Sequence, residues 1–252
     1  MTHPLSLENK VIVVTGGAQG IGEATAQLCA ERGAAVVIAD FQQEKGEAAA
    51  ARMREAGLQV DFCATDVRDD DSVRALFEFT RQRHGRLDGL VCAAGVLRGP
   101  WLSPEELPLE EFQMTLDVND KGEFLCARYA ASLLEASGKG VLVVVASGAG
   151  VKSPSSSLAY GASKGGANGL GMTLEQHLAP RGIRVNVLCP GNIVTDMKLS
   201  VDIARAQKES RSVEAEIARA NREYGFPPGI AKIIGFMLSE EADYLRGSLF
   251  TR

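Results

Sequence analysis

The sequence has neither a long hydrophobic run nor a strong excess of charge of one sign. Its 252 residues include 27 Lys and Arg against 32 Asp and Glu, which gives a formal net charge of −5. This balance argues against a general nucleic-acid binder, because such a protein carries a basic face. No apolar run approaches the roughly 20 residues of a membrane span, and the N-terminus shows no signal-peptide pattern. We therefore expect a cytoplasmic protein whose partners are neither nucleic acid nor membrane.

The sequence also lacks the paired cysteines of a disulfide scaffold or a zinc site. Its five cysteines are widely spaced, and no Cys-x-x-Cys pair occurs. The three histidines, His3, His84 and His177, form no ligand pattern with them. Cysteines in apolar runs and small-residue helices act as small hydrophobic residues. We expect reduced structural thiols, a reducing compartment and no metal.

What the sequence does have is an alternation of two patterns in an ordinary globular composition, with 45% hydrophobic and 23% charged residues. Short β-branched runs, expected to be strands, lie at residues 11–15, 35–40, 59–64, 89–93, 141–146 and 183–188. Helical patterns lie at residues 20–32, 42–55, 69–84, 109–136 and 158–179, followed by a helix at 228–238 and a short strand near 248–250. Strands without alternation are buried on both faces, as in a parallel sheet with helices on each side. We predict one α/β domain over residues 1–252, a doubly wound, Rossmann-like parallel sheet in three layers.

Residues 192–226 interrupt this alternation with a charged segment that is too long for an ordinary connection. Val213, Ile217, Ala220 and Tyr224 recur within it at helical spacing and form an amphipathic stripe. Because long loops at sheet ends tend to carry function, we expect this segment to be a lid over a substrate pocket. The alternative is a pair of surface helices without a gating role.

A glycine-rich loop directly follows the first expected strand and opens a helix. It reads Thr15-Gly16-Gly17-Ala18-Gln19-Gly20-Ile21-Gly22. Glycines let the backbone turn sharply and bring N–H groups close to a pyrophosphate, while the helix N-terminus adds a partial positive charge. A plain strand-to-helix turn is the alternative, but it needs fewer glycines. The strand before the loop and the helix after it therefore favour a dinucleotide site.

Asp40 ends the second expected strand, at the distance from the glycine loop where an acid meets the adenosine ribose. A carboxylate there accepts hydrogen bonds from the ribose hydroxyls of NAD and repels the 2′-phosphate of NADP. Phe41 and Gln19 place no cation where that phosphate would lie. The acid at Asp40 and the uncharged Gln19 in the glycine loop therefore both favour NAD. Asp40 is also suited to capping the helix at 42–55, and one carboxylate can serve both purposes.

Tyr160 and Lys164 lie one turn apart on the same face of the expected helix at 158–179. A free phenol, with a pKa of about 10, is a poor base at neutral pH. A fixed cation favours the phenolate, as does an oxidised nicotinamide ring, and a phenolate can take a proton from an alcohol. Ser147 follows the strand at 141–146, where its hydroxyl can hydrogen-bond a substrate oxygen. Tyr-x-x-x-Lys alone is an ordinary surface pair; Ser147 and the glycine loop make it specific.

Together these motifs resemble the short-chain dehydrogenase/reductase family in its single-domain branch, from about Leu7 to Phe250. The resemblance implies a catalytic tetrad of Asn119, Ser147, Tyr160 and Lys164. In that tetrad Asn119 kinks its helix and holds a proton-relaying water, and Lys164 also holds the cofactor ribose. By the same resemblance, Asp66 and Val67 contact the adenine, and the segment Pro190-Gly191-Asn192-Ile193-Val194-Thr195 contacts the nicotinamide carboxamide.

The expected cofactor site combines these motifs. Its residues are Gly16, Gln19, Gly20, Ile21, Gly22, Asp40, Phe41, Asp66, Val67, Cys92, Ala93, Gly95, Tyr160, Lys164, Pro190, Gly191, Ile193 and Thr195. One departure from the family lies among them, because Cys92-Ala93-Ala94-Gly95 stands where the family usually has Asn-Asn-Ala-Gly. The usual first asparagine braces adjacent loops, so we expect Cys92 to loosen that brace while backbone contacts to the cofactor remain.

The expected helix at 158–179 is rich in glycine, at Gly161, Gly165, Gly166, Gly169 and Gly171. Each interior glycine costs about 0.5–1 kcal/mol relative to alanine, but small residues allow helices to approach closely. Some of these glycines are explained by packing within the monomer. The family resemblance implies that one glycine-rich face also packs on a second subunit beside residues 109–136. We therefore expect a homo-oligomer, a dimer or a homotetramer.

We predict an NAD-dependent oxidoreductase that interconverts a secondary alcohol and a ketone. Its expected pocket residues are Leu97, Trp101, Gly148, Ser153, Asn192 and residues 197–224, although Trp101 is equally explained as packing. This mixture suits polyols, hydroxy acids, small cyclic alcohols or steroids. One alternative is an NADPH-dependent 3-oxoacyl thioester reductase, against which Asp40 argues. The other is a non-catalytic NAD-binding scaffold, which the intact Ser147, Tyr160 and Lys164 disfavour.

Overall fold

Seven parallel strands form one sheet in the order β3-β2-β1-β4-β5-β6-β7. The structure is a computed structural model that describes residues 5–251, so that His3 lies outside the described residues. The strands are β1 (Val11–Thr15), β2 (Ala35–Asp40), β3 (Val60–Ala64), β4 (Gly89–Cys92), β5 (Val141–Val145), β6 (Arg184–Cys189) and β7 (Gly247–Phe250). The order reverses between β1 and β4, which pair directly. The sheet is therefore doubly wound, as predicted.

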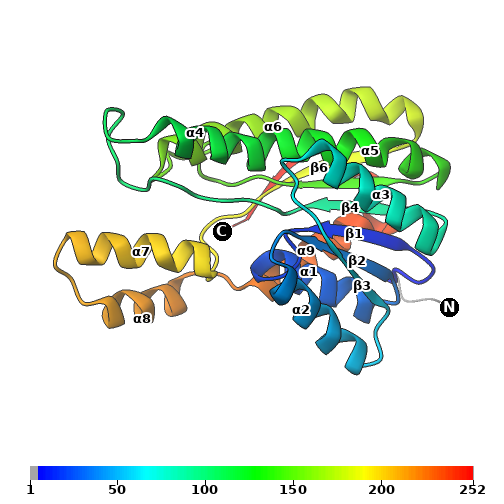
Figure 1. The fold of residues 1–252 in the computed structure, drawn as a ribbon, viewed down its shortest axis with the longest axis horizontal. Helices are drawn as coiled ribbons and strands as arrows, with labels where there is room; N and C mark the ends of the chain where they lie inside the picture. The colour runs from blue at the N-terminus through cyan, green and yellow to red at the C-terminus, as the bar shows by residue number, and fades with distance from the viewer. Residues whose placement is uncertain (1–4, 252) are drawn as a thin grey trace.

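Helices cover both faces of this sheet, and Figure 1 shows them as layers above and below it. One layer consists of α3 (Asp70–His84), α4 (Leu109–Leu116), α5 (Gly122–Ala136) and α6 (Leu158–Leu178), and the other of α1 (Gly20–Glu31), α2 (Gln43–Glu55) and α9 (Pro227–Leu238). Each layer has its own apolar core against the sheet, one containing Leu90 and Leu134 and the other Ile12 and Ile234. Every residue of β1 and β5 is buried because both faces of these strands are covered.

The helix expected at residues 109–136 is divided, which corrects the prediction of one continuous helix. After α4, a π-helical turn, η1 (Asp117–Lys121), precedes α5. Asn119 lies buried in this turn. Hydrophobic periodicity did not reveal the interruption, because one extra residue in a turn barely disturbs the pattern. The resemblance did imply an irregularity at Asn119, and π turns of this kind are frequent at functional sites.

The ends of the other helices follow their capping residues. The Asp69 carboxylate accepts a hydrogen bond from Asp71 N at 3.1 Å at the start of α3, which ends before Gly85 with a φ of 73°. Two short 3₁₀ turns, η2 (Ala179–Arg181) and η3 (Glu240–Ala242), follow α6 and α9. The observed bounds differ from the predicted ones by one or two residues, as is usual where helix and strand ends fray.

The charged segment at residues 192–226 folds as two helices, α7 (Asp196–Lys208) and α8 (Val213–Glu223), which project away from the sheet (Figure 1). Thr195 and Ser212 cap them by accepting hydrogen bonds from Lys198 N and Ala215 N at 3.2 and 3.1 Å. A β-bridge between Ile193 and Gly225 closes the base of the pair. The segment is therefore an ordered helical hairpin.

The described residues also bear on membrane-spanning helices, metal sites and disulfide bonds. Within residues 5–251, no helix combines the length and the apolar character needed to cross a membrane. The same residues contain no group of three or more His, Cys, Asp or Glu side chains placed to hold a metal ion. All five cysteines are free, and all except Cys63 are buried.

Candidate functional site

A cleft of about 1670 Å³ runs along the carboxyl ends of the strands, where doubly wound sheets bind their ligands. Its walls come from the glycine loop, the segments that follow β2, β4, β5 and β6, the start of α6, and the α7–α8 hairpin. The predicted catalytic and cofactor residues that line it are Gly16, Gln19, Gly20, Ile21, Gly22, Asp40, Phe41, Asp66, Val67, Ala93, Gly95, Ser147, Tyr160, Lys164, Pro190, Gly191, Ile193 and Thr195. The predicted substrate-pocket residues Leu97, Trp101, Gly148, Ser153 and Asn192 line the same cleft. Two predicted residues, Asn119 and Cys92, are not part of its lining.

The glycine loop is packed so closely that side chains would not fit at two of its positions. Gly16 has a φ of 66°, and a Cβ on it would lie 2.7 Å from the backbone N of Ala94. A Cβ on Gly22 would lie 2.1 Å from the carbonyl oxygen of Gly16. This packing brings the N-terminus of α1 to the cleft, where its free N–H groups and partial positive charge suit a pyrophosphate. The residues present therefore fit the nicotinamide dinucleotide that this fold implies.

Asp40 fastens the glycine loop to the start of α2. Its carboxylate, 6% exposed, accepts hydrogen bonds from Ala18 N at 3.1 Å and from Gln42 N at 2.9 Å. Asp40 thus braces Gln42, the residue before α2, and does not cap a first-turn N–H of that helix. Each of its oxygens keeps a lone pair for a ribose hydroxyl. Sequence reasoning missed one nearby cation, because Lys45 lies on α2 with its Nζ 3.1 Å from Gln19 Oε1.

Asp66 is held by a neighbour that sequence reasoning also missed. Arg68 donates from Nε and Nη2 to the Asp66 carboxylate, the shorter contact being 2.6 Å. These hydrogen bonds hold the pKa of Asp66 below its usual range. Asp66 and Arg68 both line the cleft, so the expected adenine-contacting acid is present as a charged pair. The Asp-x-Arg spacing was the available signal.

The start of α6 fixes Tyr160 and Lys164. Ser157 caps this helix, since its Oγ accepts a hydrogen bond from Tyr160 N at 3.1 Å and donates one to Arg98 O at 2.6 Å. One turn later, the buried Lys164 donates from Nζ to Val145 O at 2.8 Å. That nitrogen lies 6.0 Å from the centre of the Tyr160 ring. The predicted pair therefore shares one helix face and is anchored to the end of β5.

Ser147 lies just beyond the end of β5. Its Oγ accepts a hydrogen bond from Ala149 N at 3.1 Å, which fixes the turn that follows the strand. The hydroxyl hydrogen is thereby free to point toward a bound oxygen, since a hydroxyl both accepts and donates. Because Lys164 is bonded to Val145 O, the serine and the lysine meet at the same strand end. Hydroxyl, phenol and ammonium thus line one wall of the cleft.

Asn119 lies behind this wall and connects two of its parts. Its Oδ1 accepts a hydrogen bond from Val96 N at 2.8 Å, and its Nδ2 donates to Val96 O at 3.0 Å and to Ser163 Oγ at 2.8 Å. Asn119 therefore ties the π turn to the loop after β4 and to α6. Cys92 is buried in the core against Cys126, and both this contact and burial raise the pKa of its thiol. Its side chain contributes no polar group to the cleft.

Two buried acids behind Lys164 were not identified from the sequence. Glu123 Oε1 lies 3.9 Å from Lys164 Nζ, and burial raises the pKa of Glu123 to about 8. Burial also raises the pKa of Asp120, to about 6. Glu123 gave no distinct signal in the sequence, since it follows the charged residues Asp120 and Lys121 and reads as one more polar helix position.

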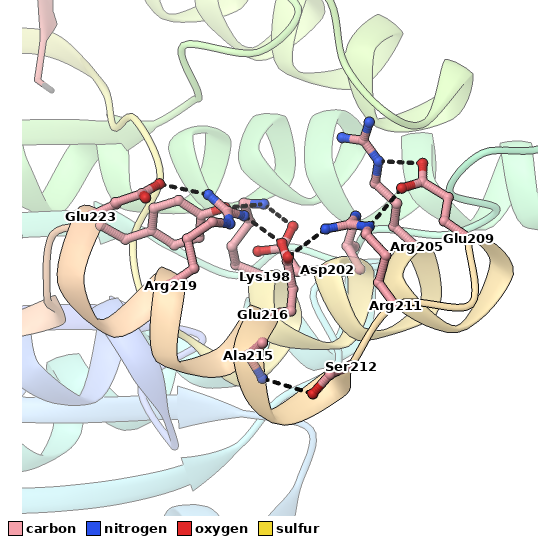
Figure 2. A network of polar contacts seen from close by, with 12 residues as sticks. Lys198, Asp202, Arg205, Glu209, Arg211, Ser212, Ala215, Glu216, Arg219 and Glu223 are labelled. Atoms are coloured by element: carbon pink, nitrogen blue, oxygen red, sulfur yellow. Dashed lines mark hydrogen bonds and ion pairs between the residues drawn. The ribbon is translucent and has the colours of Figure 1, made fainter.

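The α7–α8 hairpin brings a network of ion pairs to the substrate side of the cleft (Figure 2). Glu216, buried on α8, lies between Arg211 and Arg219, and the hydrogen bonds from Arg219 hold its pKa below the usual range. On α7, Arg205 lies over the ring of Trp101 at 4.9 Å. Trp101 therefore lines the cleft and also packs against the hairpin. The sequence had left open whether it is a pocket residue or a packing residue, and it is both.

Comparisons with known proteins agree with this geometry. The family model for short chain dehydrogenase matches residues 10–206. The cis-4-hydroxycyclohexanecarboxylate dehydrogenase of Sinomonas cyclohexanicum is 36% identical over 242 residues, which cover 95% of this chain and 93% of that protein. The (+)-borneol dehydrogenase 1 of Salvia officinalis is 33% identical over 245 residues, which cover 96% of this chain and 91% of that protein.

A solved structure extends the likeness to the whole fold. The crystal structure of NAD⁺-bound xylitol dehydrogenase matches with a TM-score of 0.88 at 29% identity, covering 96% of this chain and 97% of that one. The sequence, the fold and the residues that line the cleft thus indicate the same group of enzymes, which act on CH–OH groups. This chain therefore belongs to the short-chain dehydrogenase/reductase family of oxidoreductases.

Proposed function

We propose that this chain is an NAD-dependent dehydrogenase that interconverts a secondary alcohol and its ketone, with Tyr160 as general acid and base. The observation that carries the proposal is that Tyr160, Lys164 and Ser147 line the same cleft as the glycine loop. The presence of Ser147 and Tyr160 beside the anchored Lys164 also argues against a non-catalytic NAD-binding scaffold, because holding the cofactor ribose requires the lysine alone.

The choice of NAD over NADP rests on Asp40. Its carboxylate lines the cleft at the end of β2, where it accepts hydrogen bonds from ribose hydroxyls and repels a 2′-phosphate. Phe41 beside it carries no charge and is 68% exposed. The same reasoning disfavours an NADPH-dependent 3-oxoacyl thioester reductase. The structural likeness to an NAD⁺-bound enzyme supports this choice.

The proposed chemistry assigns each side chain one task. When bound, the nicotinamide would supply the hydride acceptor for oxidation of the carbinol carbon and the hydride donor for the reverse reaction. Ser147 donates its hydroxyl hydrogen to the substrate oxygen and holds it beside Tyr160. Tyr160, as a phenolate, removes the hydroxyl proton, and in the reverse direction it returns that proton to the ketone oxygen. The charge of Lys164 favours the phenolate.

Asn119 takes a supporting part in this proposal. Its hydrogen bonds to Val96 and Ser163 hold the loop after β4 and helix α6 in a fixed relation, which keeps Tyr160 and Lys164 in place. The proton-relaying water that the family resemblance assigns to Asn119 belongs to the same proposal.

The substrate class that we propose is a secondary alcohol on a ring or a short chain. Relatives act on a hydroxycyclohexanecarboxylate, on borneol and on xylitol. The cleft offers apolar surface from Leu97 and Trp101 and a hydroxyl from Ser153 on its substrate side. Such a mixed lining suits a compact alcohol with both apolar and polar faces.

A screen for NADH formation tests this proposal. The panel contains cis-4-hydroxycyclohexanecarboxylate, borneol, xylitol and further cyclic secondary alcohols, each assayed with NAD and with NADP. We expect turnover of at least one alcohol with NAD. For that substrate, Tyr160→Phe removes turnover and leaves NAD binding, measured by calorimetry, largely unchanged. Retained turnover in this variant would refute the assignment of Tyr160.

We also propose that the α7–α8 hairpin is a lid over the substrate side of the cleft. Its inner residues Asp202, Arg205, Glu216 and Arg219 line the cleft although the hairpin projects away from the sheet. The base of the hairpin, at Ile193 and Gly225, adjoins the segment expected to contact the nicotinamide. A movement of the hairpin would thus change access to the reacting atoms.

A homo-oligomer is the final element of the proposed function. Large apolar side chains are exposed on α4, α5 and α6, namely Leu109, Phe124, Leu158 and Met172. Packing within the monomer explains two glycines of α6, because a Cβ would lie 2.4 Å from Asp120 at Gly166 and 2.4 Å from Val187 at Gly171. A Cβ on Gly169 would meet nothing within 4 Å, so this position is available to a second subunit.

A further inference from the structure

Glu123 is a buried carboxyl group without a hydrogen-bond partner. Its side chain is 2% exposed, and neither oxygen has a partner. The contact at 3.9 Å from Lys164 Nζ exceeds hydrogen-bond length. A buried polar group of this kind is costly and calls for an explanation, often a functional one.

The surroundings of Glu123 contain more acid than base. Lys164 faces it from α6, Asp120 from the π turn and Cys92 from β4, and Cys92 is in turn in contact with Cys126 of α5. Neither Asp120 oxygen has a hydrogen-bond partner, and Gly166 of α6 leaves the space that Asp120 occupies. Among the described residues, the ammonium group of Lys164 is therefore the single cation beside the carboxyl groups of Glu123 and Asp120. Two carboxylates that share one cation do not ionise independently, so the group holds a proton into the neutral range.

We propose that Glu123 is a positioning residue that regulates the charge felt by Tyr160 through Lys164. With its proton, Glu123 leaves the ammonium charge of Lys164 uncompensated, and this charge favours the phenolate of Tyr160. Without its proton, Glu123 forms a net-neutral pair with Lys164 and opposes the phenolate. This inference rests on the proposed function of Tyr160.

The geometry makes this coupling effective. Lys164 Nζ lies between the two groups, 3.9 Å from Glu123 Oε1 and 6.0 Å from the Tyr160 ring centre. Glu123 and Lys164 are buried, and charges there interact more strongly than in water because the effective dielectric constant is lower. Tyr160 is half-buried at the wall of the cleft. The ionisations of Glu123 and Tyr160 are therefore antagonistic. The kcat for alcohol oxidation should consequently rise with pH over a wider range of pH than the ionisation of a single group would give.

The test compares pH profiles of kcat for alcohol oxidation in the wild type and in Glu123→Gln, which keeps the size of the side chain and removes its charge. We expect a shallow rise in the wild type. In the variant we expect a steeper rise whose midpoint lies about one pH unit lower, the scale on which one nearby charge acts. Glu135→Gln provides a matched control, because Glu135 lies exposed on the same helix and pairs with Arg181. Its profile should equal that of the wild type.

An active Glu123→Gln enzyme with the wild-type profile would overturn the inference, even if kcat were lower at every pH. That result leaves the proposed function standing, whereas turnover by Tyr160→Phe overturns the proposed role of Tyr160 as general acid and base. If Glu123→Gln does not fold, infrared titration of the wild type decides, with Glu123→Asp as the reference for band assignment. A protonated carboxyl band from Glu123 that persists above pH 6 supports the inference. Its absence there would refute it.

Discussion

Asp40 combines two tasks in one carboxylate. Its oxygens accept hydrogen bonds from the backbone on both sides, at Ala18 and Gln42, and so set the shape of the loop that faces the pyrophosphate. The same charge faces the position of the adenosine ribose in the proposed site. Lys45 lies nearby with its Nζ on Gln19, so the glycine loop is not without positive charge. The proposed preference for NAD therefore depends on Asp40 more than on the absence of cations.

We expect Asp40→Asn to lower the ratio of kcat/KM for NAD over that for NADP at least tenfold, since the variant no longer repels the 2′-phosphate. A tenfold change corresponds to about 1.4 kcal/mol. The measurement is a steady-state assay with both cofactors on the same variant, which cancels any loss of stability. Asp71→Asn, an exposed carboxylate paired with Arg74, is the control. An unchanged ratio would show that Asp40 only braces the residue before α2.

At the scale of elements, the α7–α8 hairpin combines ion pairs within its helices and connecting loop with the buried apolar side chains of Val201, Ala206 and Ala220. Figure 2 shows Glu216 of α8 between Arg211 and Arg219, and further pairs join Arg205 to Glu209 and Lys198 to Asp202. Exposed ion pairs of this kind contribute about 0–1 kcal/mol each, but Glu216 is buried and shared by two arginines. Its loss leaves two guanidinium groups without their common partner. Glu216 is thus the residue on which the geometry of the hairpin depends most.

We expect Glu216→Gln to raise KM for the alcohol several-fold while kcat changes much less. A loosened hairpin orders the substrate less well, whereas Tyr160 and Lys164 lie on a separate element. The control is Glu214→Gln on the exposed face of α8. The two variants are compared by steady-state kinetics with saturating NAD. Equal KM values in both variants would favour a surface helix pair without a gating role.

At the scale of the whole molecule, four of the exposed large apolar side chains lie on helices of one layer. They are Leu109 on α4, Phe124 on α5, and Leu158 and Met172 on α6, with Met172 at 55%. Apolar side chains that gather on one face are typical of an interaction surface, and α4 and α5 both contact α6. The position of Gly169 on the same layer, open to a close approach, agrees with a second copy of the chain as partner.

We expect the wild type to sediment as an oligomer at micromolar concentration and Met172→Asp to shift it toward the monomer, because a charge would be buried at the interface. Sedimentation velocity over a concentration series provides the measurement. Phe226→Asp, at the start of α9 on the opposite layer, provides the control. A wild-type protein that remains monomeric at every concentration would contradict the proposed homo-oligomer.

Much of the fold and the candidate site could be predicted because the signals are local. The alternation of β-branched runs with helical patterns predicted the strands of the sheet within one or two residues. The glycine-rich loop at residues 15–22 and the pair Tyr160 and Lys164, one helical turn apart, each span only a few residues of the sequence. The π turn at Asn119 could not be derived from periodicity, since the contact that holds Asn119 in it is a hydrogen bond to Val96, 23 residues away in the sequence.

Short motifs in a fixed order along the chain were enough to predict the type of fold, the family and the proposed reaction. The groups that surround those motifs became visible only in the folded chain. Folding brings the buried Glu123 to Lys164 and ties Asp40 to Ala18. These contacts join residues that are far apart in the sequence, so no local pattern could predict them. The charge around the proposed catalytic group is therefore a property of packing.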